Sequence, residues 1–143
     1  LVAVGRGRGA PEALLVDRYL ARIRPTPTLI EIDGRKSRDA EDEWRRIEER
    51  LPVGAVRVVL DERGRDLGSV AFAARLGGWR DEGREIACVI GGAYGLTHAA
   101  RASADLLLAF GSATWPHLLV RAMLVEQLYR AQEILAGRPY HHG

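Results

Sequence analysis

Short apolar runs recur along the chain and alternate with longer stretches in which apolar residues are spaced as on a helix. The runs occupy residues 1–4, 28–32, 56–60, 86–90 and 105–110, and they hold few charges. Continuous apolar runs of this length are typical of strands that are buried on both faces. The pattern therefore predicts five strands in one largely buried sheet.

The stretches between these runs carry the end signals of helices. Pro11 fits the first turn of a helix, and Pro25 and Pro27 end it. Further helices are predicted at residues 38–51 and 67–79, in a short segment after Gly95, and at about residues 116–136. Strands that alternate with helices, without a linker or repeat between them, predict one α/β domain over residues 1–143 with a mostly parallel sheet.

Glycine and polar residues directly follow three of the predicted strands. Gly91, Gly92 and Gly95 come after the fourth strand, residues 61–64 after the third, and residues 111–117 after the fifth. In a parallel sheet the ligand lies beyond the carboxyl ends of the strands, and glycines there let the backbone approach it closely. A tight turn would explain the glycines equally well. Their spacing also differs from the Gly-x-Gly-x-x-Gly fingerprint of dinucleotide binding.

The last predicted helix is apolar on several sides. Apolar residues occupy positions 118–120 and 122–125, which together go round the helix. Such a helix has to be covered by the sheet and, on a further side, by a partner such as a second subunit. Arg121 and Glu126 stand within this helix, and a buried charge needs a partner or a task. An ion pair, internal or between subunits, and a functional role both remain open.

The composition limits what the whole surface can bind. The formal net charge is +2 and apolar residues make up 47% of the chain, so this is a globular protein and not a strong binder of polyanions as a whole. Lys36 is the only lysine, and arginines gather in predicted loops, at Arg6 and Arg8, at Arg35 and Arg38, and at Arg63 and Arg65. If these loops converge at one edge of the sheet, they form a basic rim that suits phosphate. Simple solvated loops are the alternative.

Three further features concern compartment, membrane and metal. Cys88 is the only cysteine, so an intramolecular disulfide is impossible and we expect a cytoplasmic protein. Every apolar stretch falls short of the roughly 20 residues that span a bilayer, so we expect no membrane partner. The four histidines show no ligand spacing with one another or with the cysteine, and we expect no metal.

Six short motifs occur in one order along the chain, at residues 1–5, 60–64, 90–95, 115–121, 126–131 and 139–141. Each motif is unspecific when taken alone. The ordered set resembles the RlmH family, the 23S ribosomal RNA (pseudouridine-N3)-methyltransferases of the SPOUT superfamily. The resemblance spans nearly the whole chain and is weakest at residues 35–51.

This resemblance implies a more specific fold than the hydrophobic pattern does. A SPOUT protein is an α/β domain with a mostly parallel sheet, flanked by helices, whose C-terminal segment is tied into a trefoil knot. Knots are rare exceptions among protein folds. Members of the superfamily form homodimers through the knotted C-terminal region, which would explain why the last helix is apolar on several sides.

The resemblance also implies the cofactor and the residues that hold it. The cofactor is S-adenosyl-L-methionine (SAM), and its pocket is built from three loops. The residues that match the pocket are Leu60, Gly92, Gly111, Ser112, Ala113, Thr114, Trp115 and Pro116. Small residues in the last of these loops permit the close backbone approach that adenine recognition needs.

The implied reaction moves a methyl group from SAM to N3 of a pseudouridine in 23S ribosomal RNA, within the assembled ribosome. Glu126 is the first candidate for the base that takes the N3 proton, and His141 is the second because imidazole exchanges protons near neutrality. Arg121 is expected to orient the reacting groups. Tyr140 would stack on the target base, and the remaining RNA contacts are expected at His142, Arg6 and Arg8.

Two alternatives stay open at this point. The first keeps the SPOUT fold and changes the substrate to a transfer RNA or to another ribosomal RNA site. The second is a ribosome-binding module without catalysis, which would not bind SAM. Methylation assays with different RNAs would distinguish the first alternative from methylation of the 23S pseudouridine. Titration with SAM would distinguish the second alternative from a methyltransferase.

Overall fold

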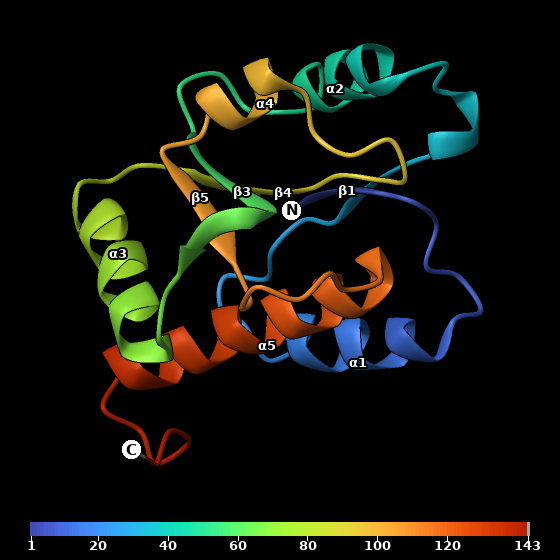
Figure 1. Ribbon diagram of the computed structural model, residues 1–143. Coiled ribbons are helices and arrows are strands. Elements are labelled where there is room, and N and C mark those ends of the chain that lie inside the picture. Colours follow the sequence, from blue (N-terminus) through green and yellow to red (C-terminus); the bar gives the residue numbers. More distant parts are fainter. Residues whose placement is uncertain (143) are drawn as a thin grey trace.

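Five parallel strands form one sheet in the computed structural model, which describes residues 1–142 (Figure 1). The strands are β1 (Val2–Val4), β2 (Ile30–Ile32), β3 (Val56–Asp66), β4 (Ile86–Ile90) and β5 (Leu106–Ala109), in the spatial order β2-β1-β4-β3-β5. Every pairing between neighbouring strands is parallel. The carboxyl ends of β1, β4, β3 and β5 therefore meet along one edge of the sheet, which confirms the predicted α/β architecture.

Helices cover both faces of this sheet. The helices are α1 (Pro11–Leu20), α2 (Ala40–Glu48), α3 (Ser69–Asp81), α4 (His98–Ala102) and α5 (His117–Leu135), with a 3-10 turn η1 (Gly34–Lys36) before α2. Helices α2 and α4 lie on one face, and α1, α3 and α5 lie on the other (Figure 1). Trp44 and Ile47 of α2 join the core on the first face, and Phe72 of α3 and Leu124 of α5 join the core on the second.

The central strands hold the layers together because their side chains are apolar on both faces. Val56, Val58, Val59 and Val89 are completely or almost completely withdrawn from solvent. Full burial of a valine side chain contributes about 1.5–3 kcal/mol relative to exposure. Branched side chains also fit a pleated, two-sided surface well. The buried-strand interpretation of the apolar runs is therefore confirmed.

Strand β3 is longer than the hydrophobic run predicts. The run ends at Leu60, but the strand continues to Asp66 with a break in register, so that both Leu60 and Arg65 pair with Leu108 of β5. The chain can pass β5 this closely because residue 64 is glycine: a Cβ at Gly64 would lie 2.7 Å from the backbone of Leu107. The apolar pattern does not predict this extension, because most of its residues are charged.

The charged helix α2 is anchored by polar contacts as well as by its apolar stripe. Asp39 caps its first turn, since the side chain accepts a hydrogen bond from the Asp42 N–H at 2.8 Å. The prediction of a helix over residues 38–51 is confirmed in position and is a few residues too long at each end. The described helices include none that is long and apolar enough to cross a membrane. The trefoil knot stays a prediction.

Candidate active site

A cleft opens at the carboxyl ends of β3, β4 and β5, beside the start of α5. Its volume is about 450 Å³, within the range of pockets that hold small molecules and cofactors. Apolar side chains form its floor, among them Leu60 in the middle of β3, and Ile90 and Leu108 at or next to the ends of β4 and β5. The site therefore lies where a parallel sheet is expected to bind its ligand.

Three segments that are far apart in the sequence form the walls of this cleft. The first of these segments follows Leu60 and is the extension of β3, the second is the loop with Gly91, Gly92 and Gly95, and the third is the loop that connects β5 to α5. The described lining contains seven of the eight predicted cofactor residues, namely Leu60, Gly92, Gly111, Ala113, Thr114, Trp115 and Pro116. Ser112 belongs to the same loop, is exposed, and is not among the described lining residues.

Hydrogen bonds tie the third loop to its neighbours. Trp115 Nε1 donates to the carbonyl oxygen of Phe110 at 2.9 Å, which closes the loop on itself. The Thr114 hydroxyl donates to the Glu62 carboxylate at 2.5 Å and so links this loop to the extension of β3 after Leu60. Each interaction fixes backbone that would otherwise move, and this favours a preformed site.

A buried glutamate supports the glycine loop from behind. Glu43 of α2 is only 2% exposed, and its Oε1 accepts a hydrogen bond from the Gly92 N–H at 2.9 Å. Burial raises the pKa of this carboxyl, and the Gly92 N–H partly opposes that shift. A Cβ at Gly92 would lie 2.5 Å from Cγ1 of Val4 and 2.8 Å from Glu43 Oε2. Position 92 therefore has room for glycine alone.

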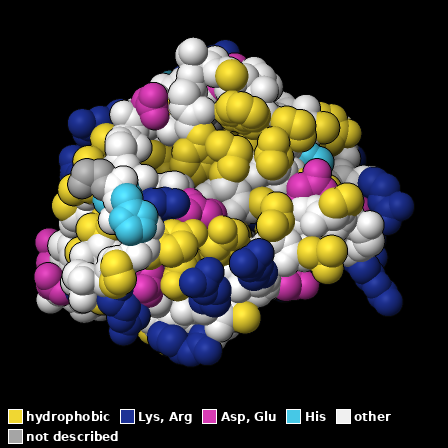
Figure 2. All heavy atoms as spheres, turned by 90° about the horizontal axis from the view of Figure 1, so that it is seen from below, with side chains coloured by type: hydrophobic (Ala, Val, Ile, Leu, Met, Phe, Trp, Pro, Cys, Tyr) yellow, Lys and Arg dark blue, Asp and Glu magenta, His cyan; other side chains and the backbone are white. Residues whose placement is uncertain are grey.

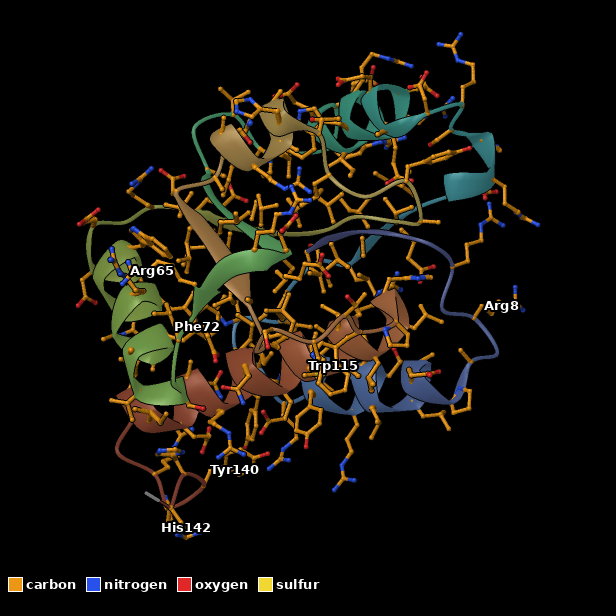
Figure 3. All side chains as sticks on the ribbon, viewed as in Figure 1. Arg8, Arg65, Phe72, Trp115, Tyr140 and His142 are labelled. Carbon is orange, nitrogen blue, oxygen red and sulfur yellow. The ribbon has the colours of Figure 1, made fainter. Side chains whose placement is uncertain are left out.

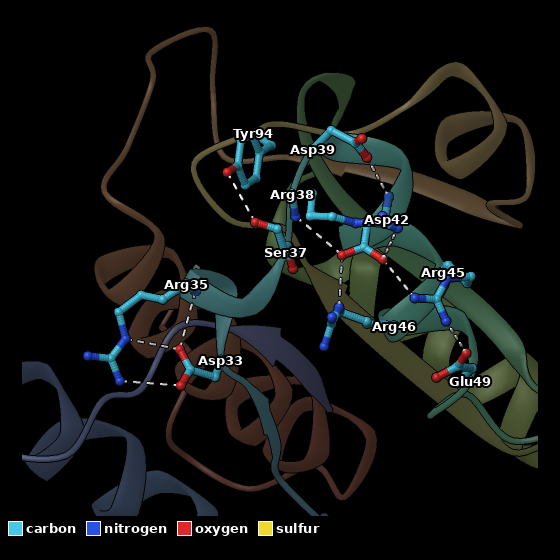
Figure 4. Close-up of polar contacts among 10 residues, drawn as sticks. All are labelled: Asp33, Arg35, Ser37, Arg38, Asp39, Asp42, Arg45, Arg46, Glu49 and Tyr94. Carbon is cyan, nitrogen blue, oxygen red and sulfur yellow. Dashed lines mark hydrogen bonds and ion pairs between the residues drawn. The ribbon is translucent and has the colours of Figure 1, made fainter.

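The burial of Glu43 could not be recognised from the sequence, because this residue belongs to a highly charged helix whose composition is typical of a solvated surface. The same region holds a second tie to the cleft, because the Tyr94 hydroxyl of the glycine loop donates to the Ser37 carbonyl at 3.1 Å (Figure 4). The only available sequence signal was the position of Glu43, one residue before the buried Trp44 on the inner face of α2.

Ion pairs occupy most of the charged groups around η1 and α2. Arg45 and Arg46 bind the Asp42 carboxylate at 2.7 and 3.1 Å, and Arg45 above all holds the pKa of that carboxyl well below its usual range (Figure 4). Asp33 binds Arg35 in the same way, with Nε at 3.1 Å. These arginines therefore have carboxylate partners and are not a free positive surface.

Arg121 is buried behind the cleft. Its side chain is 2% exposed, and its guanidinium binds the Glu31 carboxylate at 2.5 Å and the Gly5 carbonyl at 2.8 Å. Glu31 also accepts a hydrogen bond from the Gly7 N–H at 2.8 Å. Arg121 thus fastens the loop after β1 to α5. The internal ion pair is one of the two interpretations that the sequence left open.

The other predicted catalytic residues come together between the middle of α5 and the C-terminal tail. Glu126 Oε1 accepts hydrogen bonds from Arg130 Nη2 at 2.7 Å and from the Tyr140 hydroxyl at 3.1 Å. Arg130 Nη1 lies 3.2 Å from Nδ1 of His141. Burial raises the pKa of Tyr140, and hydrogen bonds with Tyr19 and Glu126 raise it further. Tyr140 is therefore a proton donor in this group. Glu126, Arg130, Tyr140 and His141 are called the tail cluster below.

The tail cluster and the cleft of one chain are separate. The cleft reaches along α5 as far as Val120. Glu126 is six residues further, which is about 9 Å along a helix and about 240° around it. The two groups of predicted residues therefore face different directions, and Glu126 does not contribute to the described lining of the cleft in its own chain.

The arginines predicted to form one basic rim are dispersed. Arg8 and Arg65 lie on opposite sides of the molecule (Figure 3), because β2 and β1 occupy one end of the sheet and β3 lies next to the other end. Arg6 is 3.6 Å from Asp33. Of the two alternatives that the sequence left open, the structure favours separate loops over one continuous rim, and the individual RNA contacts at Arg6, Arg8 and His142 stay predictions. His142 is exposed on the C-terminal tail (Figure 3).

An apolar groove lies between the cleft and the tail cluster. Its volume is about 440 Å³, and its lining includes Tyr19 of α1, Phe72 of α3 and Met123 of α5. Leu15 also lines it and remains 45% exposed, and Leu14 beside it is 74% exposed. Hydrophobic side chains gather on the face formed by α1 and α5 (Figure 2). Patches of this kind mark protein–protein contacts in soluble proteins.

Metal ligation finds no support in the described residues. Within residues 1–142 no three His, Cys, Asp or Glu side chains come together as a metal site requires. Cys88 is buried, and burial raises the pKa of its thiol to about 11, which makes it a poor nucleophile. The expectation of a protein without metal stays a prediction.

Comparison with known proteins adds independent information. A family model described as a predicted SPOUT methyltransferase matches residues 1–141. The chain is 55% identical to ribosomal RNA large subunit methyltransferase H of Rhodospirillum centenum, over 99% of this chain and 96% of that protein. Proteins of the same name from Cereibacter sphaeroides and Paracoccus denitrificans are 50% and 48% identical, with the same coverage.

These matches extend through all three segments of the cleft and the tail cluster. The architecture described above, a parallel sheet with a glycine-lined cleft at its carboxyl edge, agrees with the matching family. The chain therefore belongs to the SPOUT methyltransferase family and, within it, to the RlmH family.

Proposed function

We propose that this protein transfers a methyl group from SAM to N3 of a pseudouridine in 23S ribosomal RNA, within the ribosome in the cytoplasm. The observation that carries the proposal is the cleft, whose described lining gathers seven of the eight residues matched to the cofactor loops of the family. The relatives named ribosomal RNA large subunit methyltransferase H support the choice of RNA class.

The residues around the cleft fit SAM. Leu60, Ile90 and Leu108 provide an apolar surface for the adenine ring, while Gly92 and Gly111 allow backbone groups to approach it. Helix α5 begins at the cleft, so the free N–H groups of its first turn suit the carboxylate of the methionine part. When bound, SAM supplies an electrophilic methyl group on sulfur.

The tail cluster is proposed to hold the acceptor nucleotide. N3 of pseudouridine carries a proton, which has to leave as the bond from N3 to the methyl carbon forms and the bond from that carbon to sulfur breaks. Glu126 and His141 are the two groups that can take this proton. Arg130 contacts both, at 2.7 Å and 3.2 Å, and so holds them in fixed relation. Tyr140 presents its ring for stacking on a base.

A homodimer would bring the two parts of the site together. In a two-fold dimer the same patch of each chain contacts its counterpart, so opposite ends of the two α5 helices can become neighbours. The apolar groove beside Leu15 and Met123 provides a surface for such contact. The proposed active site therefore combines the cleft of one chain with the tail cluster of the second. The trefoil knot that the family resemblance implies would lie at this interface.

Mass spectrometry of 23S ribosomal RNA from a strain that lacks the gene tests the proposal. We expect one pseudouridine to lose a methyl group, and we expect purified protein with SAM to restore it on ribosomes. An unchanged methylation pattern would overturn the proposed reaction. Methylation of transfer RNA or of another ribosomal RNA position would favour the first alternative. If titration calorimetry detects no binding of SAM, that result would favour the second alternative, a non-catalytic ribosome-binding module.

A further inference from the structure

Four arginines surround a hollow at the C-terminal end of α5. The hollow has a volume of about 540 Å³. Arg22 and Arg24 come from the segment after α1, Arg80 from the last turn of α3, and Arg138 from the segment after α5. All four are exposed. These residues are called the arginine cluster.

The arginine cluster concentrates positive charge. Within the described lining of the hollow, Glu133 is the only acidic residue, and it binds Arg138 at 3.0 Å. Asp81 lies beside the hollow and approaches Arg80 no closer than 3.5 Å, in a pair where both side chains are well exposed. The hollow therefore carries a larger excess of positive charge than the whole chain, whose formal net charge is +2.

Local contacts hold two of these arginines in place. The guanidinium carbon of Arg22 lies 4.0 Å from the centre of the Tyr129 ring, and Arg22 Nη2 donates to the Tyr129 hydroxyl at 2.7 Å. Arg24 Nη1 donates to the carbonyl oxygens of Ala21 and Ile23 at 2.6 and 2.8 Å. A guanidinium has five N–H donors, so further donors remain for a ligand. Preordered donors lose less conformational entropy on binding.

The partners of these arginines differ from those at the other edge of the molecule. At the loops after β1 and β2, Arg6 and Arg35 both contact the Asp33 carboxylate. Arg22 instead stacks on tyrosine, and Arg24 binds carbonyl oxygens, which carry no net charge. Two of the four arginines, Arg22 and Arg24, therefore have no described carboxylate partner, and such positive charge suits a polyanion.

The arginine cluster is also continuous with the tail cluster. The rings of Tyr129 and Tyr140 meet edge to face with their centres 4.8 Å apart, and Arg22 lies 5.6 Å from the centre of the Tyr140 ring. The distance to the cleft of the same chain is much greater, since His117 and Glu133 are about 24 Å apart along the helix axis. A ligand on the cluster would therefore reach the tail cluster directly.

We propose that the arginine cluster binds the phosphate backbone of the substrate RNA next to the nucleotide held by the tail cluster. This inference rests on the proposed RNA substrate. Arginine suits the role because its planar fork contacts two phosphate oxygens at once. Such contacts give affinity and register, whereas the base in the active site gives specificity.

A matched pair of variants on α3 tests the inference. Arg80→Gln removes one charge from the arginine cluster, and Arg75→Gln removes one charge from an exposed position on the same helix, outside the described lining of the hollow. Binding of a 23S ribosomal RNA fragment is measured by fluorescence anisotropy over a series of salt concentrations. Methylation of ribosomes and calorimetric SAM binding are measured in parallel.

For Arg80→Gln we expect RNA binding to weaken about threefold to tenfold and the slope of log K against log salt to become shallower by about 0.7–0.9. Arg75→Gln should keep the RNA affinity and the salt slope of the unmodified protein. Both variants should bind SAM as tightly as the unmodified protein does. Arg24→Gln should repeat the effect of Arg80→Gln. If Arg80→Gln and Arg24→Gln both keep the affinity and salt slope of the unmodified protein, the arginine cluster is not an RNA surface.

The RNA-binding measurement distinguishes a failure of this inference from a failure of the proposed function. Unmodified protein that binds RNA but does not methylate it, with binding weakened by Arg80→Gln, would contradict the proposed reaction and still support the arginine cluster. Unmodified protein that methylates ribosomes, with no change in either variant, would support the reaction and overturn the cluster. Thermal unfolding of each variant, unchanged from the original, shows that the fold is intact.

Discussion

The two ends of α5 have opposite chemistry. At its start, Pro116 and His117 border a cleft of glycines and apolar side chains, in which the backbone itself comes close to the ligand space. At its far end, arginines and tyrosines project long, polar side chains from three separate segments. The difference fits the two tasks proposed above, since backbone can enclose a small cofactor, whereas extended charged groups can contact a large polyanion.

One rigid helix joins these ends and also keeps them apart. A chain alone cannot bring Glu126 into the cleft that ends at Val120, since α5 turns the two residues to different sides. A second chain in the opposite orientation removes this obstacle. The separation within one chain and the exposed apolar groove therefore both support the proposal that the working unit is a dimer.

The largest effect is expected from Gly92→Ala at the cleft end. The new Cβ would meet Val4 and Glu43, so the glycine loop has to move. A displacement of about 1 Å near reacting groups can lower a rate about 100-fold, and we expect a loss of that order in kcat/KM with weakened SAM binding. Gly78→Ala is the control, because a Cβ at Gly78 has no described neighbour within 4 Å. Full activity of Gly92→Ala would contradict the close fit of this loop.

A smaller effect is expected from Tyr140→Phe at the far end. The change removes the hydroxyl that donates to Glu126 at 3.1 Å and leaves the ring in place. A hydrogen bond to a charged group contributes about 1.5–3 kcal/mol, so kcat should fall about tenfold or more. Single-turnover methylation measures the change. SAM affinity should stay constant, and a loss of SAM affinity instead of rate would remove the distinction between the two ends.

Glu43→Ala is expected to act on the cleft end alone. It leaves the Gly92 N–H without its described carboxylate partner, and a lost buried partner costs about 1–3 kcal/mol, or about fivefold to 150-fold in SAM affinity. Glu43→Gln keeps an oxygen acceptor at the same place and should retain most of the affinity. Calorimetry with SAM compares the two. Glu41→Gln, at an exposed position of the same helix, serves as control. Equal losses in Glu43→Ala and Glu41→Gln would contradict a positioning role.

The smallest effect concerns the pH dependence of stability. Burial raises the pKa of Glu43 in the folded protein above the ordinary value of 4.5, so the folded state holds this proton more tightly than the unfolded state. The resulting stabilisation is fully present below pH 4.5 and is lost as the pH rises through the raised pKa. Urea unfolding should show that Glu43→Gln gains stability relative to the original protein over this rise. A constant difference at all pH values would contradict the raised pKa.

Local signals in the sequence sufficed for the strands and for the glycine loop that follows β4, whereas the assignment of cofactor residues came from the family resemblance and stays a prediction. Apolar runs such as residues 56–60 are buried whatever their neighbours, and Gly92 follows its strand directly, so both could be predicted without knowledge of the strand order. The part of β3 beyond Leu60 could not be predicted in this way, because it depends on the close approach of Gly64 to the backbone of β5.

Contacts between distant segments were beyond the reach of the sequence. Arg121 meets Glu31 across 90 positions, and Arg22 meets Tyr129 across 107. Periodicity describes which face of an element is buried and not which element covers it. The single basic rim does not form for the same reason, because the loop with Arg8 follows β1 while Arg65 lies in β3, nearer the other end of the sheet.

Complementation between two inactive variants tests the central claim most directly. Gly92→Ala disables the cleft, and Glu126→Ala disables the tail cluster; the two are co-expressed with different tags and the mixed dimer is purified. In that dimer one site combines an intact cleft with an intact tail cluster from the other chain. We predict that it regains about half the activity of the original dimer, while each variant alone stays inactive. A mixed dimer as inactive as its parents would contradict an active site shared between two chains.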